Sequence, residues 1–223
     1  MTGPYQLIRS RRRTIALIVR EDGSLVVRAP LHSAEEDIRT FVESKAAWIR
    51  RTQARVDESL RARIKKFEPG EQFWYLGKTY PLVIVPPSRS ALVWDSAFHL
   101  SSSSRANAER VFIYWYKAEA ARILSERVSW YAEQGGFAYR RIRITSARTR
   151  WGSCSPDGTL CFSYRLVMAP QEAIDYVAVH ELVHLKLKNH ARAFWTQVEA
   201  IMPDYRPRLD WLNRNGRFLG IGK

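Results

Sequence analysis

The first third of the chain combines two β patterns with one long helical pattern. Residues 14–20 and 25–29 are rich in β-branched side chains, and an Asp-Gly pair between them is typical of a hairpin turn. Ser33 and Glu36 have the spacing of a capping box, after which apolar residues recur every three or four positions. The pattern predicts a hairpin followed by a single helix that continues to about Lys66.

The middle of the chain contains a second β region and a second helical pattern. Short apolar runs between turn residues predict four strands, at residues 73–76, 80–85, 91–94 and 98–100. A serine tract at 101–104 has the composition of a linker, and helical spacing then extends from about 106 to 134. We therefore expect a β-rich region with one long helix at residues 1–104 and a second domain at 105–223.

The last third has a β-β-α-α-α pattern. Strands are expected at 141–146 and 159–166, and helices are expected to begin at Pro170, near Ala191 and near Tyr205. Strands and helices are segregated rather than regularly alternating, which indicates the α+β class.

The first of these three helices carries the pattern His180-Glu181-Leu182-Val183-His184. Histidines four residues apart lie on one helical face, within reach of a single tetrahedral ion. Glu181 is adjacent to the first histidine, so its carboxylate can reach a zinc-bound water without being a ligand, as a general base must. Zinc lowers the pKa of such a water toward roughly 7.

A third metal ligand is expected downstream of this pattern. His190 lies six residues past His184, so the helix must end between them, and Asn189 could end it in the left-handed conformation. Glu199 on the following helix is the competing third ligand. Apolar residues surround the motif on both sides, and burial would make unliganded histidines costly.

The amino-acid composition indicates a folded protein without a membrane span or a disulfide framework. The 223 residues are 46% hydrophobic and 26% charged, which supports a folded core, and no apolar run approaches the roughly 20 residues of a membrane span. The two cysteines, Cys154 and Cys161, are too few for a disulfide framework, so we expect a cytoplasmic protein. The formal net charge of +14 admits nucleic acid, nucleotides or acidic proteins as partners.

Several ordered motifs resemble one known family. These are RTRWGSC at 148–154, SYRLVMAP at 163–170, VHELVHLKLKNHARAFW from 179 and MPDYRPRLDWLNRNG from 202. They are similar to the YgjP-like metallopeptidases, relatives of the SprT-like and WLM-type zinc proteases. The resemblance implies N-terminal β-hairpins with a long helix, and a C-terminal zincin-like domain with a small antiparallel sheet and an active-site HExxH helix. It also implies that His180, His184 and His190 bind zinc and that Glu181 is the catalytic base.

The resemblance further places the RTRWGSC strand beside the cleft, where a strand edge could bind an extended peptide, although a purely structural hairpin is equally consistent. Candidate substrate-binding residues are Arg150, Trp151, Arg165 and Tyr205, with Arg206 as another possible donor to an anionic intermediate. We therefore expect a zinc metallopeptidase acting on a peptide or protein. The alternatives are a metal-dependent nucleoside triphosphate (UTP-type) pyrophosphohydrolase and a nucleic-acid-associated protein with a structural zinc.

Overall fold

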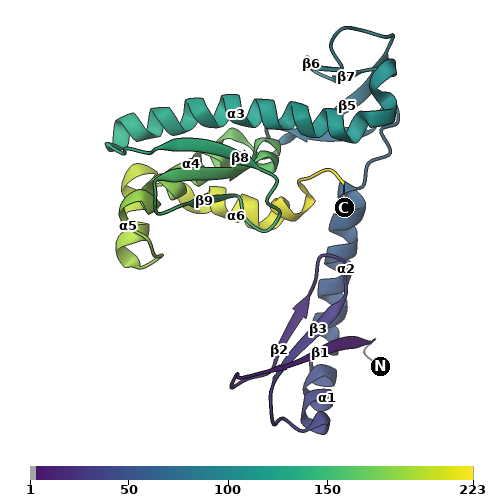
Figure 1. The fold of residues 1–223 in the computed structure, drawn as a ribbon, viewed down its shortest axis with the longest axis vertical. Coiled ribbons are helices and arrows are strands. Elements are labelled where there is room, and N and C mark those ends of the chain that lie inside the picture. The colour runs from purple at the N-terminus through teal and green to yellow at the C-terminus, as the bar shows by residue number, and fades with distance from the viewer. Residues whose placement is uncertain (1–3, 223) are drawn as a thin grey trace. The chain divides into compact units, whose positions relative to one another are not determined.

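The computed structural model describes residues 4–222, which form two compact units, up to Ile64 and from Lys65 onward (Figure 1). The boundary predicted after residue 104 lies inside the second unit. Phe73 and Phe98, from the predicted β region, pack against Phe112 of the long helix, with ring centroids 4.3 and 5.2 Å away. This shared aromatic core joins the two parts, and a serine-rich composition alone does not reveal that.

The first unit is a three-stranded sheet with two helices. Its strands are β1 (Tyr5–Ser10), β2 (Ala16–Val19) and β3 (Leu25–Pro30), in the order β1-β3-β2. The predicted hairpin is confirmed as the antiparallel pair β2–β3, whereas β1, which pairs parallel to β3, was not predicted. The helices are α1 (Glu35–Ser44) and α2 (Ala46–Arg63).

The single helix predicted for this unit is broken at Lys45. The backbone there has φ −103° and ψ 8°, and the Lys45 N–H donates to the Val42 carbonyl over 3.1 Å. The break lets Val42 and Ile49, from the two helices, enter one core with the strand residue Val27. The predicted capping box does not form, because Ala34 is the N-cap and no side chain caps the helix.

The second unit begins with a four-stranded sheet that agrees with the prediction. Its strands are β4 (Gln72–Tyr75), β5 (Lys78–Val85), β6 (Leu92–Trp94) and β7 (Phe98–Ser101), in the order β4-β5-β7-β6. The β4–β5 turn is tied to the segment before the motif helix by a hydrogen bond from Gly77 N to Met168 O, 3.1 Å long. A Cβ on Gly77 would lie 2.6 Å from Cγ of Pro170, so only glycine fits this close approach.

A short 3₁₀ helix (Ser102–Asn107) and α3 (Ala108–Gly135) lead to a second sheet. This sheet contains β8 (Arg141–Thr145), β9 (Gly152–Cys154) and β10 (Thr159–Ser163), in the order β8-β10-β9. β8 is parallel and β9 antiparallel to β10, so the sheet is mixed rather than purely antiparallel as expected. β9 is therefore an edge strand.

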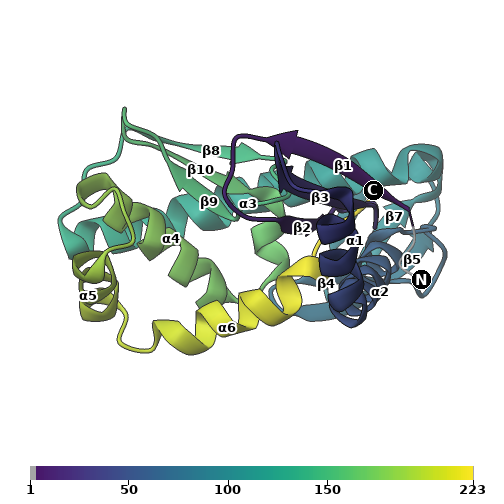
Figure 2. The same cartoon turned by 90° about the horizontal axis from the view of Figure 1, so that it is seen from below.

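The three C-terminal helices occur where the pattern predicts them. After a 3₁₀ segment (Tyr164–Met168) they are α4 (Gln171–Lys186), α5 (Arg192–Ile201) and α6 (Tyr205–Asn215), followed by a 3₁₀ turn (Gly216–Phe218). α4 packs against α3, α5, α6 and β9, which buries it on most sides (Figure 2). The α+β class is confirmed. Within residues 4–222 every helix is too short or too polar to cross a bilayer.

Candidate active site

Three imidazoles converge at the C-terminal half of α4. His190 Nε2 lies 3.1 Å from Nε2 of His184 and 3.1 Å from Nε2 of His180. Helical spacing places His180 and His184 one turn apart, and His190 arrives from the segment after the helix. Within the described part of the chain, this is the one group of three or more His, Cys, Asp or Glu side chains arranged to hold a metal ion.

The path that brings His190 to the other two rings differs from the one expected. α4 ends because Leu187 is extended, with φ −123° and ψ 103°. Asn189 does not adopt the left-handed conformation; its side-chain oxygen accepts a 3.2 Å hydrogen bond from the Ala191 N–H, which starts the turn into α5. Glu199 is exposed on α5 and does not belong to the cluster, whose third member is His190.

Hydrogen bonding determines which nitrogen of His184 faces the cluster. Its Nδ1 lies 2.9 Å from the carbonyl oxygen of Leu187, which can only accept, so Nδ1 carries the proton. The Nε2 lone pair is then directed at the other two rings, as metal ligation requires. Phe194 packs against all three imidazoles, with ring centroids 4.5 to 4.9 Å away, and restricts their rotation.

Burial keeps the first two imidazoles neutral. Desolvation, with smaller contributions from His184 and His190, lowers the pKa of His180 to about 3. Burial also lowers the pKa of His184, against an opposing effect of the Leu187 carbonyl. A neutral imidazole has a free lone pair, so these rings are in the protonation state that binds metal.

Glu181 has a buried carboxyl group, one oxygen of which has no hydrogen-bond partner within the described residues. The residue is 4% exposed, and its Oε2 has no hydrogen-bond partner among residues 4–222. Burial raises the pKa of this carboxyl to about 8, and the positive charge of Arg150 lowers it by a smaller amount. Such an orphaned acceptor is unusual in a protein interior, which makes Glu181 a candidate functional group.

The edge strand β9 closes over this carboxyl through a glycine. A Cβ on Gly152 would lie 2.5 Å from Oε1 of Glu181, so a larger residue would displace the carboxylate or the strand. Sequence reasoning did not identify Gly152. The available signal was a glycine inside a strand, which marks a close approach by another group.

Some backbone N–H and C=O groups of β9 point toward the free edge of the sheet. Trp151 and Ser155 are hydrogen bonded to the β10 side, through Ser163 N–H to Trp151 O (2.8 Å) and Ser155 N–H to Thr159 O (3.0 Å). An antiparallel ladder alternates such bonds, so the N–H and C=O groups of Gly152 and Cys154 point away from β10. This edge is free to pair with another strand.

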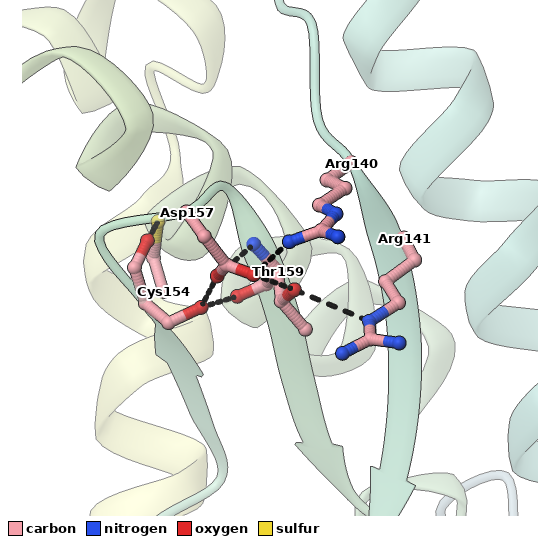
Figure 3. A network of polar contacts seen from close by, with 6 residues as sticks. Arg140, Arg141, Cys154, Asp157 and Thr159 are labelled. Atoms are coloured by element: carbon pink, nitrogen blue, oxygen red, sulfur yellow. Dashed lines mark hydrogen bonds and ion pairs between the residues drawn. The ribbon is translucent and has the colours of Figure 1, made fainter.

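The turn between β9 and β10 is held by Asp157 (Figure 3). Its carboxylate accepts hydrogen bonds from Thr159 Oγ1 (3.0 Å) and from the guanidinium of Arg140 (2.7 Å). Cys154 and Cys161 are free thiols. They pair across the ladder with Leu160 and Ser153 respectively, so they project from opposite faces and do not meet across the hairpin.

The predicted substrate-binding residues separate into two groups. Arg150 and Trp151 line a cavity of about 220 Å³ together with His180 and Glu181. Arg165 instead is 5% exposed and donates to the carbonyl oxygen of Ala147 over 2.7 Å, so it braces the loop before β9.

Tyr205 is also placed away from the cavity surface. It is buried, and its ring stacks on Trp195 and on Tyr176. Arg206 donates to the Tyr205 hydroxyl over 3.4 Å. Tyr176, which was not predicted, lines the cavity with its hydroxyl 3.4 Å from Nδ1 of His180.

A comparison with known families shows which family the chain belongs to. Residues 13–215 match the family model for the YgjP-like metallopeptidase domain. The chain belongs to the YgjP-like metallopeptidase family. The chain is also similar to a solved structure, the metallopeptidase zymogen of Pyrococcus abyssi abylysin, with 21% sequence identity and a TM-score of 0.38. The aligned region covers 45% of this chain and 99% of that one. No curated protein matches the chain. As a YgjP-like protein, the chain is a metallohydrolase by family.

Proposed function

We propose that this YgjP-like protein is a zinc metallopeptidase in which His180, His184 and His190 hold the ion and Glu181 is the general base. The observation that carries the proposal is the convergence of three Nε2 atoms, 3.1 Å from His190 to each of the others, beside a buried carboxylate oxygen without a partner. Three nitrogen ligands suit zinc and leave a coordination position free.

The histidines of the cluster suit a zinc ion because of the protonation state of their rings. The neutral imidazoles of His180 and His184 offer lone pairs, and the Leu187 carbonyl orients His184, as an outer-shell partner does for metal-ligating histidines. When bound, zinc supplies a Lewis acid that polarises a carbonyl and lowers the pKa of water to about 7.

Glu181 supplies the proton transfers. Its Oε2 makes no hydrogen bond within the described chain, so it is available to accept the proton of an attacking water and to pass it to the leaving amine. Arg150 stabilises the carboxylate form by its charge. Gly152 leaves the space that the carboxylate occupies.

The edge of β9 supports a peptide as the substrate. The outward N–H and C=O groups of Gly152 and Cys154 can pair with an extended chain, which would be added as a further strand beside the active site. Backbone pairing recognises any extended peptide, and the adjoining cavity then selects among side chains.

The test combines metal content with turnover. The zinc-loaded protein is incubated with a peptide library and, separately, with nucleoside triphosphates, beside Glu181→Gln, His184→Ala and the matched control Glu199→Gln. We expect peptide cleavage by the unchanged protein and by Glu199→Gln, zinc without cleavage in Glu181→Gln, and loss of zinc in His184→Ala. Hydrolysis of triphosphates alone, abolished by Glu181→Gln, would replace the peptidase by a pyrophosphohydrolase.

Substitution of the two cysteines tests the alternative that the zinc is structural. Structural sites have four protein ligands, often including thiolates, and the cluster found within residues 4–222 contains three histidines and no cysteine. Zinc stoichiometry measured by mass spectrometry should therefore be unchanged in Cys154→Ser and in Cys161→Ser. Loss of zinc from either variant would contradict the open site.

A further inference from the structure

A second cavity lies on the outer face of the β8-β10-β9 sheet. The strand register places Arg143 of β8, Cys161 of β10 and Ser153 of β9 in one row, and Thr145 and Ser163 in the next. Cross-strand neighbours project from the same face, so these side chains form a common floor. Together with Arg150 they line a cavity of about 240 Å³, which we call the arginine pocket.

The two arginines of this pocket differ from their neighbours in sequence. Arg140 donates to Asp157 and Arg141 donates to Thr159, as Figure 3 shows. Within residues 4–222, neither Arg143 nor Arg150 donates a hydrogen bond or forms an ion pair, and no acidic residue lines the pocket. The Thr145 hydroxyl donates to the Phe162 carbonyl, so the two guanidinium groups and the Ser153 hydroxyl are the donors that face the pocket. Such a donor-rich site has an oxyanion as its complement.

The position of the pocket relates it to the active site. Arg150, Trp151 and Gly152 line both the arginine pocket and the cavity that contains His180 and Glu181. The segment at the start of β9 is therefore a wall between the two. A peptide added along the β9 edge would project successive side chains to opposite faces of the sheet. One set would point toward α4 and the other toward the arginine pocket.

We infer that the arginine pocket binds an acidic side chain of the peptide substrate, and that the enzyme therefore prefers peptides with Asp or Glu close to the cleaved bond. This inference rests on the proposed peptidase function. A carboxylate on an extended strand fits the place of the pocket beside a strand edge. The lining residues are strand and loop residues, without the helix N-terminus or glycine-rich loop that typically holds a polyphosphate.

The experiment measures binding rather than turnover. Zinc-loaded Glu181→Gln protein is immobilised and exposed to a random decapeptide library, and the retained peptides are sequenced by mass spectrometry. We expect Asp and Glu to be enriched about tenfold over Asn and Gln at one position, since a charge-assisted bidentate pair distinguishes a carboxylate from an amide. Adding Arg143→Gln should reduce this enrichment to about twofold, because Arg150 alone remains.

Two further variants control for charge and folding. Arg141→Gln removes the same charge from the same strand outside the pocket, so the enrichment should persist. Arg143→Glu should shift the preference toward Lys and Arg. Equal retention of acidic and amide peptides, or equal loss with Arg141→Gln and Arg143→Gln, would overturn the inference. So would Arg143-dependent binding of a nucleoside triphosphate without acidic enrichment. Absence of cleavage by the unchanged enzyme, with the enrichment intact, would instead count against the proposed function.

Discussion

Helix α4 contains two buried carboxylates, of which one has several hydrogen-bond partners and the other has an oxygen with none. Asp175 is 6% exposed and Glu181 is 4% exposed. Asp175 accepts two hydrogen bonds from Arg127, of 2.6 and 2.9 Å, and a third from the Tyr131 hydroxyl at 3.4 Å. Oε2 of Glu181 has no partner among residues 4–222.

The difference separates a structural group from a chemical one. A buried carboxylate with a bidentate guanidinium partner recovers much of its desolvation cost and links α4 to α3. A buried carboxyl without a partner costs stability, and its presence at Glu181 fits the general-base role proposed for this residue. The same helix therefore has a structural carboxylate in its N-terminal half and the proposed catalytic one in its C-terminal half.

The largest expected effect is on catalysis at Glu181. Glu181→Gln should lower kcat for peptide cleavage by about 10³-fold, because an amide cannot accept the proton. The free energy of unfolding should change by less than about 1 kcal/mol, because glutamine has nearly the same shape and carries no buried charge. Steady-state kinetics and urea titration measure the two. A large loss of stability would mean that Glu181 is structural like Asp175.

Gly152→Ala should produce the next largest effect. The added Cβ would lie 2.5 Å from Oε1 of Glu181, and displacing a catalytic group by about 1 Å can cost about 100-fold in rate. Zinc content should remain unchanged, because the three atoms nearest to the added methyl group all belong to Glu181 and not to an imidazole. Wild-type activity in this variant would show that the carboxylate does not work from the position it has here.

Asp175→Asn tests the structural half of the helix. It leaves Arg127, whose side chain is 20% exposed, without its anionic partner, so the free energy of unfolding should fall by about 2–3 kcal/mol. The rate of peptide cleavage by the folded protein should be unaffected. The control is Asp204→Asn, which removes the exposed partner of Arg208 and should change the urea midpoint far less. Equal effects would contradict the distinction.

The smallest expected effect is that of Tyr131→Phe. The substitution removes one long hydrogen bond to Asp175 and leaves the Arg127 pair intact, so the loss should be about 0.5–1 kcal/mol. Urea titration beside Asp175→Asn measures the ratio of the two. A loss as large as that of Asp175→Asn would show that the tyrosine, rather than the guanidinium, holds the carboxylate.

Residue patterns over short stretches of the chain were enough to predict much of the fold and part of the candidate site. Spacing of four residues on a helix is enough to place His180 and His184 on one face, and the predicted strands and most helix positions follow from residue patterns over short stretches. His190 was identified because a histidine soon after the helix end can return to the same face. These features depend on neighbours in sequence.

Long-range packing decided the rest. The break at Lys45 serves a shared core, and the β region from 72 to 101 belongs with α3 because their aromatic rings interlock. Arg165 resembled a substrate ligand in sequence but is buried against the loop before β9. No local pattern indicates which distant carbonyl or ring will meet a side chain.

The candidate active site shows the same division. Helical spacing alone predicted that His180 and His184 share one face of the helix, with Glu181 next to the first of them. Only the tertiary structure brought Gly152 against Glu181 and placed Arg143 and Arg150 around one pocket. Helical spacing is a property of the backbone, whereas the approach of a strand to a helix depends on the packing of the whole second unit.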